Sequence, residues 1–326
     1  MDTSHPLHDV IMIGAGPAAL TAAIYTTREE IETTLYEKAV VGGLAATTDW
    51  IDNYPGYAAG VEGIKLAEEL RAQAERFGAK IEYGEVQKIM RKGDRIRLDT
   101  DGGEVHARAV LIATGSDHRK LGVPGEEEYY ARGVHYCATC DGAFYKDKRL
   151  IVVGAGNSGV QEALFLTRFA SHIDLLARSE VKASEVLQRK LETKKDVITV
   201  HTNVSVEEVI GTGDTMTGVR VVDNLSGEKR EMSADGVFVF IGLVPNTGFL
   251  SGSDIEVDSV GLIKTNAALE TSIPGVFAAG DVRSGATMQI ASAVGDGATA
   301  ALRIREHLER LESHAPHSAA AAPVAV

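Results

Sequence analysis

The chain has 326 residues, of which 44% are hydrophobic and 24% are charged, and its formal net charge at pH 7 is −13. This composition excludes a wholly disordered protein, the length indicates about two domains, and the acidic balance argues against a nucleic-acid-binding surface. The longest apolar run, Val237–Val244, is much shorter than the ~20 residues that a membrane-spanning helix needs. The N-terminus lacks the basic and apolar regions of a signal peptide, so we expect a cytoplasmic protein that does not bind membranes.

The N-terminal segment has the pattern strand, glycine turn, helix, strand, acid. An apolar run at Asp9–Ile13 leads into a glycine turn, a helical pattern continues to about Arg28, and a second strand at Thr33–Tyr36 ends at Glu37. Such a turn lets the backbone and the helix N-terminus approach a pyrophosphate, and an acid 21 residues after Gly16 is placed to bind a ribose 2′-hydroxyl. A tight turn without a ligand would need the same glycines. We predict a nucleotide-binding turn made of Gly14, Gly16, Pro17, Ala18 and Ala19.

The segment that follows the first unit predicts a β-meander. Residues 80–108 alternate as short strands, with turns at 92–94 and 100–103, and meanders of this kind often lie at the edge of a dinucleotide-binding fold. The run Ala109–Ile112 then enters Ala113-Thr114-Gly115.

The only two cysteines, Cys137 and Cys140, lie in the string CATC. A secreted disulfide scaffold would have more cysteines, and a structural zinc site needs four ligands, so we predict a redox pair and no metal. Asp141 follows directly and could relay protons as the disulfide opens. A helix-capping or turn role for this residue, which precedes Gly142, is an equally good interpretation. For His135, an ordinary hydrogen-bonding role is favoured.

A second strand–turn–helix unit begins 140 residues after the first. The strand Arg149–Val153 leads into Gly154-Ala-Gly156-Asn157-Ser158-Gly159, a helical segment to about Ala170, and a strand at His172–Leu176. Two copies in the same context indicate two nucleotide-binding units. A 2′-phosphate would need a cluster of cations after the second strand, and this one has only Arg178 beside an acid.

Residues 197–222 and 231–244 predict further strands, a final helix is expected at about Ile290–Arg310, and the low-complexity tail 313–326 is expected to be disordered. A dinucleotide site combined with a dithiol suggests hydride chemistry that ends in thiol–disulfide exchange, for which a flavin is the natural intermediary.

These strings together resemble the low-molecular-weight thioredoxin reductases, which are flavoprotein disulfide reductases. The resemblance covers nearly the whole chain and its most specific string is CATCDG; the others are Gly14-Ala-Gly-Pro-Ala-Ala, Asn53-Tyr-Pro-Gly, Ala113-Thr-Gly, Gly154-Ala-Gly-Asn-Ser-Gly, Gly242-Leu-Val-Pro-Asn246 and Gly280-Asp281-Val. It implies an α/β protein with two Rossmann-like domains: an FAD domain at 1–116 and 246–312, and an inserted NAD(P)-type domain at 117–245. The inserted domain would rotate about linkers near 115–117 and 244–246.

The resemblance also implies roles for individual residues. Cys140 would face the flavin, Cys137 would attack the disulfide of the protein substrate, and Asp141 would be the acid–base group. The expected FAD-binding positions are the first turn and Glu37, Gly42, Gly43, Leu44, Asn53, Val86, Ala113, Thr114, Gly115, Gly280, Asp281 and Gln289. The expected positions for a pyridine nucleotide are Gly154, Gly156, Asn157, Ser158 and Arg178.

The chain departs from this family at the second nucleotide site. The family pattern His-Arg-Arg-x-x-x-Arg is replaced by Ala177, Arg178, Ser179 and, at its last position, Ala183. The loss of charge-assisted phosphate contacts worth ~1.5–3 kcal/mol each would weaken NADPH binding greatly. Near the flavin, Leu44 replaces a usual Gln, and Met288-Gln289 replaces Arg-Gln.

The sequence therefore predicts a thioredoxin-reductase-like homodimeric flavoenzyme with an altered electron donor: NADH, or a ferredoxin or flavodoxin. Three alternatives stay open. They are an NADPH-dependent enzyme with a different phosphate site, a reductase for another small dithiol protein, and a non-enzymatic flavin redox sensor. A ferredoxin–NADP reductase is disfavoured by the intact CATCDG. Six basic residues around CATC could form a docking patch or simply a solvated face: Arg119, Lys120, Arg132, Lys146, Lys148 and Arg149.

Overall fold

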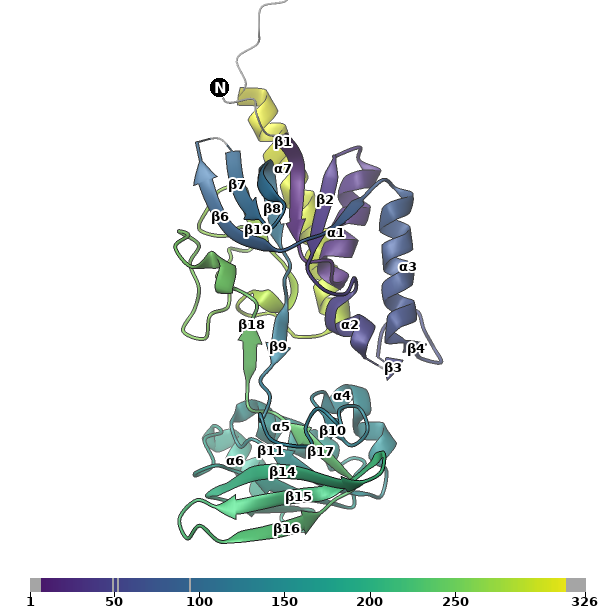
Figure 1. Ribbon diagram of the computed structural model, residues 1–326, viewed down its shortest axis with the longest axis vertical. Helices are drawn as coiled ribbons and strands as arrows, with labels where there is room; N and C mark the ends of the chain where they lie inside the picture. The colour runs from purple at the N-terminus through teal and green to yellow at the C-terminus, as the bar shows by residue number, and fades with distance from the viewer. Residues whose placement is uncertain (1–6, 49, 52, 94, 315–326) are drawn as a thin grey trace, which may run out of the picture. The chain divides into compact units, whose positions relative to one another are not determined.

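A computed structural model describes residues 7–48, 50–51, 53–93 and 95–314 of the chain. These residues form two compact units: the first contains residues 7–48, 61–93, 95–116 and 245–314, and the second contains residues 50–51, 53–60 and 117–244 (Figure 1). The expected α/β class is confirmed. The boundaries 116/117 and 245/246 remain our prediction of how the chain divides functionally.

The first unit is built on a seven-stranded sheet. Its central strand β1 (Leu7–Ile13) pairs in parallel with β2 (Thr33–Glu37) and with β8 (Gly103–Ile112). Parallel strands β5 (Lys80–Tyr83) and β19 (Val276–Ala278) extend it on the β2 and β8 sides, and the expected meander continues antiparallel from β8. The meander strands are β6 (Val86–Lys92) and β7 (Arg95–Thr100).

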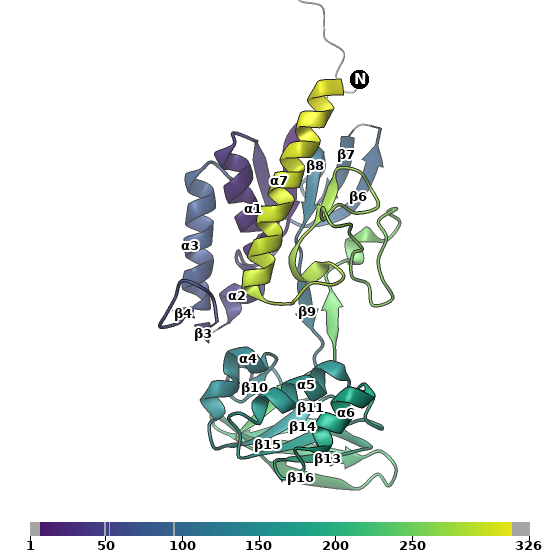
Figure 2. The same ribbon diagram turned by 180° about the vertical axis from the view of Figure 1, so that it is seen from behind.

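Three helices accompany this sheet. Helix α1 (Pro17–Arg28) lies between α3 (Gly63–Arg76) and α7 (Ile290–His314), as Figure 2 shows. Helix α1 begins at Pro17, a residue suited to the first helical position because its missing N–H would have no partner there. The expected C-terminal helix begins at Ile290 as predicted, but it extends to His314, so Ser313 and His314 are helical rather than part of a disordered tail. The rest of that tail lies outside the described residues.

Shorter elements complete the first unit, namely α2 (Gly43–Thr47), β4 (Val61–Glu62) and the 3₁₀ turns η2 (Gly248–Leu250) and η3 (Gly280–Val282). Strand β3 (Trp50–Ile51) belongs to the second unit. In the described part of the chain, no helix is long and apolar enough to cross a membrane.

The second unit has a five-stranded parallel sheet in the order β10-β17-β11-β12-β13. Helix α5 ends at Leu166, four residues before the end that the sequence pattern predicts, and the strands β11 and β12 have the predicted bounds. The bounds are β10 (Val134–His135), β11 (Arg149–Val153), β12 (His172–Leu176), β13 (Ile198–His201), β17 (Gly236–Val239), α4 (Ala138–Asp141), η1 (Gly142–Tyr145), α5 (Asn157–Leu166) and α6 (Glu185–Glu192).

The two faces of this sheet are covered differently. On β11, Leu150 and Val152 pack with α5 and α6, whereas Ile151 and Val153 face an antiparallel three-stranded sheet. This alternation is the two-residue period of a strand that is buried on both sides. The covering sheet consists of β14 (Val204–Thr212), β15 (Thr215–Asp223) and β16 (Lys229–Ser233).

The two connecting segments pair with each other. Strand β9 (Ser116–His118) lies beside β18 (Leu243–Pro245), and the pairing is flanked by hydrogen bonds from Arg119 N–H to Gly242 O and from Asn246 N–H to Gly115 O, both 3.0 Å long. The expected linkers 115–117 and 244–246 therefore fall in a short strand pair.

Candidate active site

The first glycine turn has an open face. A Cβ on Gly14, whose φ is +96°, would lie 2.6 Å from the carbonyl oxygen of Ala113, so only glycine fits. A Cβ on Gly16 would meet nothing within 4 Å, and Ala19 is completely buried where α1 packs on the sheet. Backbone N–H groups at the start of α1 thus border free space, which is the arrangement that binds phosphate.

Glu37 is held in place at the end of β2. One carboxylate oxygen accepts the N–H of Ala15 and the other accepts the N–H of Ala39, both at 2.8 Å, and the residue is only 9% exposed. Each oxygen keeps a second lone pair, so the carboxylate can still accept a hydrogen bond from a ribose hydroxyl.

Two further segments come to this turn. The Gly42 N–H donates to the carbonyl of Ala15 at 2.8 Å, and a Cβ on Gly43 would lie 3.7 Å from the Cα of Gly16. From the C-terminal part of the chain, a Cβ on Gly280 would lie 3.2 Å from the Cβ of Ala18. The structure therefore brings these predicted positions together around the N-terminus of α1.

Asp281 lies in η3 and its carboxylate has no hydrogen-bond donor among the described residues. Burial, and to a lesser degree the charge of Asp296, raise the pKa of Asp281 to about 6. A desolvated carboxylate without a donor suits a ligand hydroxyl. Together with the open face at Gly16, this fits a dinucleotide such as FAD.

The remaining predicted positions of the first unit have other surroundings. Thr114 donates its hydroxyl to Asn246 O at 2.8 Å, and Val86 is buried in the core, so only its backbone could face a ligand. The Leu44 side chain is 44% exposed, and Gln289 donates to the Met288 carbonyl at 2.9 Å. Asn53 is exposed in the loop that groups with the second unit, so its expected contact with the flavin remains a prediction.

The second glycine turn repeats the geometry of the first. A Cβ on Gly154 would collide with the Phe240 carbonyl and one on Gly159 would collide with the Gly154 carbonyl, whereas one on Gly156 would meet nothing within 4 Å. Asn157 accepts the N–H of Ser184 at 2.8 Å through its side-chain oxygen, and Ser158 is exposed in the first turn of α5. This turn also fits a pyrophosphate.

The ribose end of the second turn lacks both an acid and a cation cluster. The pair Val153–Leu176 has the register of Ile13–Tyr36, so Ala177, which is 1% exposed, takes the place of Glu37. Arg178 follows and is exposed. The sequence interpretation missed Lys182, an exposed residue whose backbone lies beside this turn because its N–H donates to Ala155 O at 2.9 Å.

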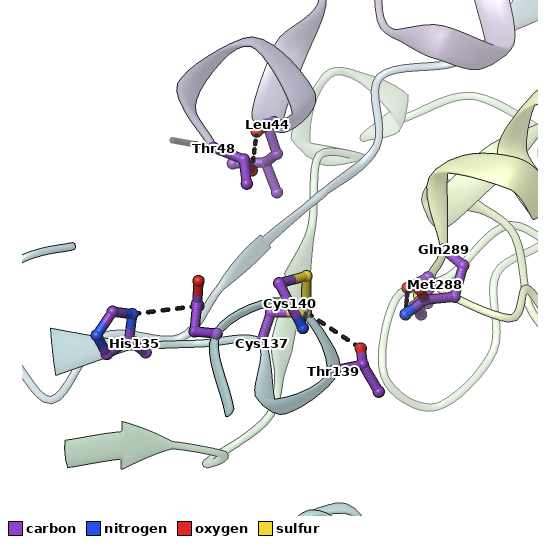
Figure 3. Close-up of a disulfide and its surroundings, with 9 residues drawn as sticks. Leu44, Thr48, His135, Cys137, Thr139, Cys140, Met288 and Gln289 are labelled. Atoms are coloured by element: carbon purple, nitrogen blue, oxygen red, sulfur yellow. Dashed lines mark hydrogen bonds and ion pairs between the residues drawn. A yellow bond between two sulfur atoms is a disulfide. The ribbon is translucent and has the colours of Figure 1, made fainter. Parts of the chain in front are cut away.

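Cys137 and Cys140 form a disulfide across α4 (Figure 3). Cys137 is the N-cap of the helix, and its sulfur accepts the N–H of Cys140 at 3.2 Å and lies 3.4 Å from the Thr139 hydroxyl. Both cysteines are partly exposed. Donors aimed at the Cys137 sulfur stabilise a thiolate there when the disulfide opens.

The Asp141 carboxylate pairs with the ring of His135, and the Oδ2–Nδ1 distance is 3.1 Å. Asp141 stands at the N-cap position of η1, as the alternative interpretation has it, but its side chain makes no capping hydrogen bond there. The other nitrogen of His135 lies 2.7 Å from the Tyr145 hydroxyl, which confirms the expected hydrogen-bonding role of this histidine. The acid next to the disulfide is therefore tied to a buried imidazole.

The six basic residues around CATC are largely neutralised. In the described part of the chain, four of them form ion pairs: Lys120 with Glu127, Arg132 with Asp214, Lys148 with Asp235 and Arg149 with Asp174. The surface near the disulfide also carries an exposed aromatic ring, because Phe144 of η1 is 60% exposed. An apolar contact is thus available to a docking partner beside the disulfide.

Comparison with known proteins places these features in context. A family described as pyridine nucleotide-disulphide oxidoreductase matches residues 8–297. The thioredoxin reductase of Listeria monocytogenes is 40% identical over 314 residues, which are 96% of this chain and 97% of that protein, and the Bacillus subtilis thioredoxin reductase is 39% identical over 94% and 96%. The crystal structure of thioredoxin reductase from Streptococcus pyogenes superimposes with a TM-score of 0.87 at 39% identity, covering 94% of this chain and all of that one.

Proposed function

The chain is a member of the pyridine nucleotide-disulphide oxidoreductase family, and from this premise we propose that it is an FAD-dependent enzyme that reduces a thioredoxin-type protein disulfide. The resemblance to low-molecular-weight thioredoxin reductases that the motifs indicated is confirmed. The observation that carries the proposal is the Cys137–Cys140 disulfide with the Asp141 carboxyl beside it, in a chain with two open nucleotide turns. We further propose a homodimer that acts in the cytoplasm.

FAD would bind to the first unit. The turn Gly14–Ala19 would hold the pyrophosphate, Glu37 the adenosine ribose, and Asp281 a hydroxyl of the ribityl or phosphate region. When bound, the flavin supplies two-electron transfer to the disulfide. The residues of the chain bind it, orient it and provide the protons.

The redox pair has a division of roles. Cys137, whose sulfur receives the Cys140 N–H, would be the thiolate that attacks the disulfide of the substrate protein, and Cys140 would close the ring again. Two electrons convert the Cys137–Cys140 disulfide into two thiolates that take up two protons, and Asp141 would exchange one of them. Phe144 would contact the substrate protein.

The electron donor is NADH or a small redox protein such as a ferredoxin or flavodoxin rather than NADPH. Support comes from the ribose end of the second turn, where buried Ala177 and exposed Arg178 replace a set of cations. A dianionic 2′-phosphate normally needs two or three basic groups. The nearby Lys182 favours the second candidate, an NADPH-dependent enzyme with a different phosphate site.

The test is anaerobic stopped-flow reduction of the FAD-loaded protein by NADPH and by NADH, followed at the long-wavelength flavin band. We expect NADPH to bleach the flavin more than about 10-fold more slowly than NADH, or neither to react, because a 2′-phosphate that loses hydration water without gaining cation partners binds at a net cost that NADH does not have. If neither reacts, reduced ferredoxin is the next donor to test. Fast bleaching by NADPH would overturn the donor proposal.

Two variants interpret that outcome. R178A and K182A remove the two cations separately, and Lys190 of α6 offers a matched exposed control. Slower bleaching by NADPH in K182A but not in K190A would identify Lys182 as the phosphate contact. A protein that binds FAD but turns over no disulfide with any donor would instead support the flavin-sensor alternative.

A further inference from the structure

His135 occupies a rigid position between the redox helix and the sheet of the second unit. Its ring is 8% exposed, stacks on Phe238 with centroids 5.2 Å apart, and meets the edge of Tyr145 at 5.3 Å. Nδ1 lies 3.1 Å from Asp141 Oδ2, and Nε2 lies 2.7 Å from the Tyr145 hydroxyl. Because both ring nitrogens have partners and one ring face is stacked on Phe238, the imidazole is held in one orientation.

Asp141 and Tyr145 together decide which nitrogen of this imidazole carries the proton, because a carboxylate oxygen only accepts whereas a hydroxyl can donate or accept. Burial, and secondarily the charges of Asp141 and Asp235, raise the pKa of Tyr145 to about 12, so its hydroxyl stays protonated at neutral pH. A protonated hydroxyl that donates to Nε2 leaves the hydrogen of the neutral ring on Nδ1, from where it donates to Asp141 Oδ2. The titratable and charged groups facing the ring are therefore Asp141 and Tyr145, with Asp235 and its ion-pair partner Lys148 beyond the tyrosine.

We propose that His135 is a positioning residue for the proton transfer at the Cys137–Cys140 disulfide. Its Nδ1–H donates a hydrogen bond to Oδ2 of Asp141. This leaves Oδ1 as the oxygen that exchanges a proton with sulfur. The inference deepens the proposed function by adding Tyr145 and His135 behind the acid–base group, and it rests on that function for the role of Asp141.

In the direction of disulfide reduction, the Cys137–Cys140 pair takes up two electrons and two protons. A dithiol reductant, or the reduced flavin in turnover, supplies two electrons, and the sulfur–sulfur bond breaks. One of the two thiolates takes its proton from Oδ1 of the Asp141 carboxyl and the other takes its proton from solvent. The carboxylate that remains is stabilised by the Nδ1–H bond, which becomes charge-assisted as Asp141 loses its proton. In the oxidising direction, Oδ1 accepts the proton of the thiol.

The test measures reduction of the disulfide by dithiothreitol in the FAD-loaded protein. The reaction is quenched with iodoacetamide at intervals at one fixed neutral pH, and alkylated cysteines are counted by mass. The assay uses neither a pyridine nucleotide nor thioredoxin, so it reads the proton step even if the proposed donor or substrate is wrong.

Four variants separate positioning from structure. We expect H135L to slow the reaction about 10-fold and D141N to slow it at least as much. The double variant should be no slower than D141N, because both changes disable the same His135–Asp141 pair. H135N keeps an amide donor for Oδ2 in place of the Nδ1–H and should retain most of the rate, whereas a purely structural role of the ring would make H135N as slow as H135L. Y145F keeps the ring but not the hydroxyl and should slow the reaction a few-fold.

His201 supplies the matched control. It lies on β13 at the opposite edge of the same sheet from β10, with Nε2 2.7 Å from Asp174 Oδ1. H201N should leave the rate unchanged, and flavin content with thermal unfolding verifies that each variant is folded. The proposal is overturned if folded H135L keeps the wild-type rate, if H135N is as slow as H135L, or if the losses in H135L and D141N multiply in the double variant.

Discussion

The two strand–turn–helix segments of this protein share a backbone and differ in side chains. In the first, the Gly14 N–H donates to Tyr36 O at 2.8 Å, and in the second the Gly154 N–H donates to Leu176 O at 3.0 Å. Both turns leave the middle glycine facing open space. The comparison teaches that the geometry for a pyrophosphate is a property of the backbone and is the same in both units.

Two positions separate the segments. At the third position of the turn, Ala19 of the first unit corresponds to Gly159 of the second, where a Cβ would collide with the preceding carbonyl. After the second strand, Glu37 corresponds to Ala177. The first difference concerns packing, whereas the second concerns which ribose the site selects.

The largest expected effect comes from exchanging the residue types at the third position of the two turns. G159A forces a methyl group against the Gly154 carbonyl and should lower the free energy of unfolding by about 2–4 kcal/mol, as overpacked core positions do. The reverse change in the first unit, A19G, removes a buried methyl group inside a helix and should cost only about 1–2 kcal/mol. Urea unfolding of the two variants measures both, and equal losses would show that the turns are packed alike.

A second prediction concerns the buried acid of the first unit. The pKa of Asp281 is raised to about 6 from 3.8, so between these pH values the folded protein binds more protons than the unfolded chain. Its contribution to stability is therefore greatest below pH ~4 and is lost as pH rises through about 6. In flavin-free protein, D281N should be more stable than wild type by about 1–3 kcal/mol at pH 7 and equally stable at pH 4.

The measurement for Asp281 is thermal unfolding of both proteins at several pH values, with and without FAD. With FAD the order should reverse, because the carboxylate then has a hydroxyl to accept. D281Q is a bulkier second variant for the flavin-free comparison. A pH-independent difference between D281N and wild type would contradict the predicted role of this carboxyl.

The smallest expected effect concerns the position after the second strand, where the first unit has Glu37 and the second has Ala177. A177E places in the second unit the acid that the first unit has, where the Ala155 N–H corresponds to the Ala15 N–H that Glu37 accepts. A carboxylate there should improve NADH binding about 5- to 10-fold through a charge-assisted hydrogen bond to the 2′-hydroxyl, and should repel NADPH. Titration of flavin-loaded A177E with each nucleotide, with A177Q as the uncharged control, checks it. An unchanged preference would mean that no nucleotide ribose lies at this position.

Elements with a strong local signal could be predicted closely. The bounds of β11 and β12 and the end of α1 at Arg28 agree with the expected ones, because glycine turns and apolar runs mark them directly. The sequence interpretation missed α3, which starts at Gly63 without a side-chain cap and so lacks a start signal. It placed the end of α5 four residues too late, because a chain of turns after Leu166 keeps the helical spacing of apolar residues.

The sequence by itself determined the chemistry that this protein carries: two glycine turns, an acid after the first, a missing cation cluster after the second, and a CATC pair. These depend on short-range spacing, and local backbone physics is enough to interpret them. Only the tertiary structure decided that His135 faces Asp141, that Ala177 takes the place of Glu37, and that Gly280 reaches the start of α1. Such contacts join separate elements, and their partners are chosen by how strands pair and helices pack.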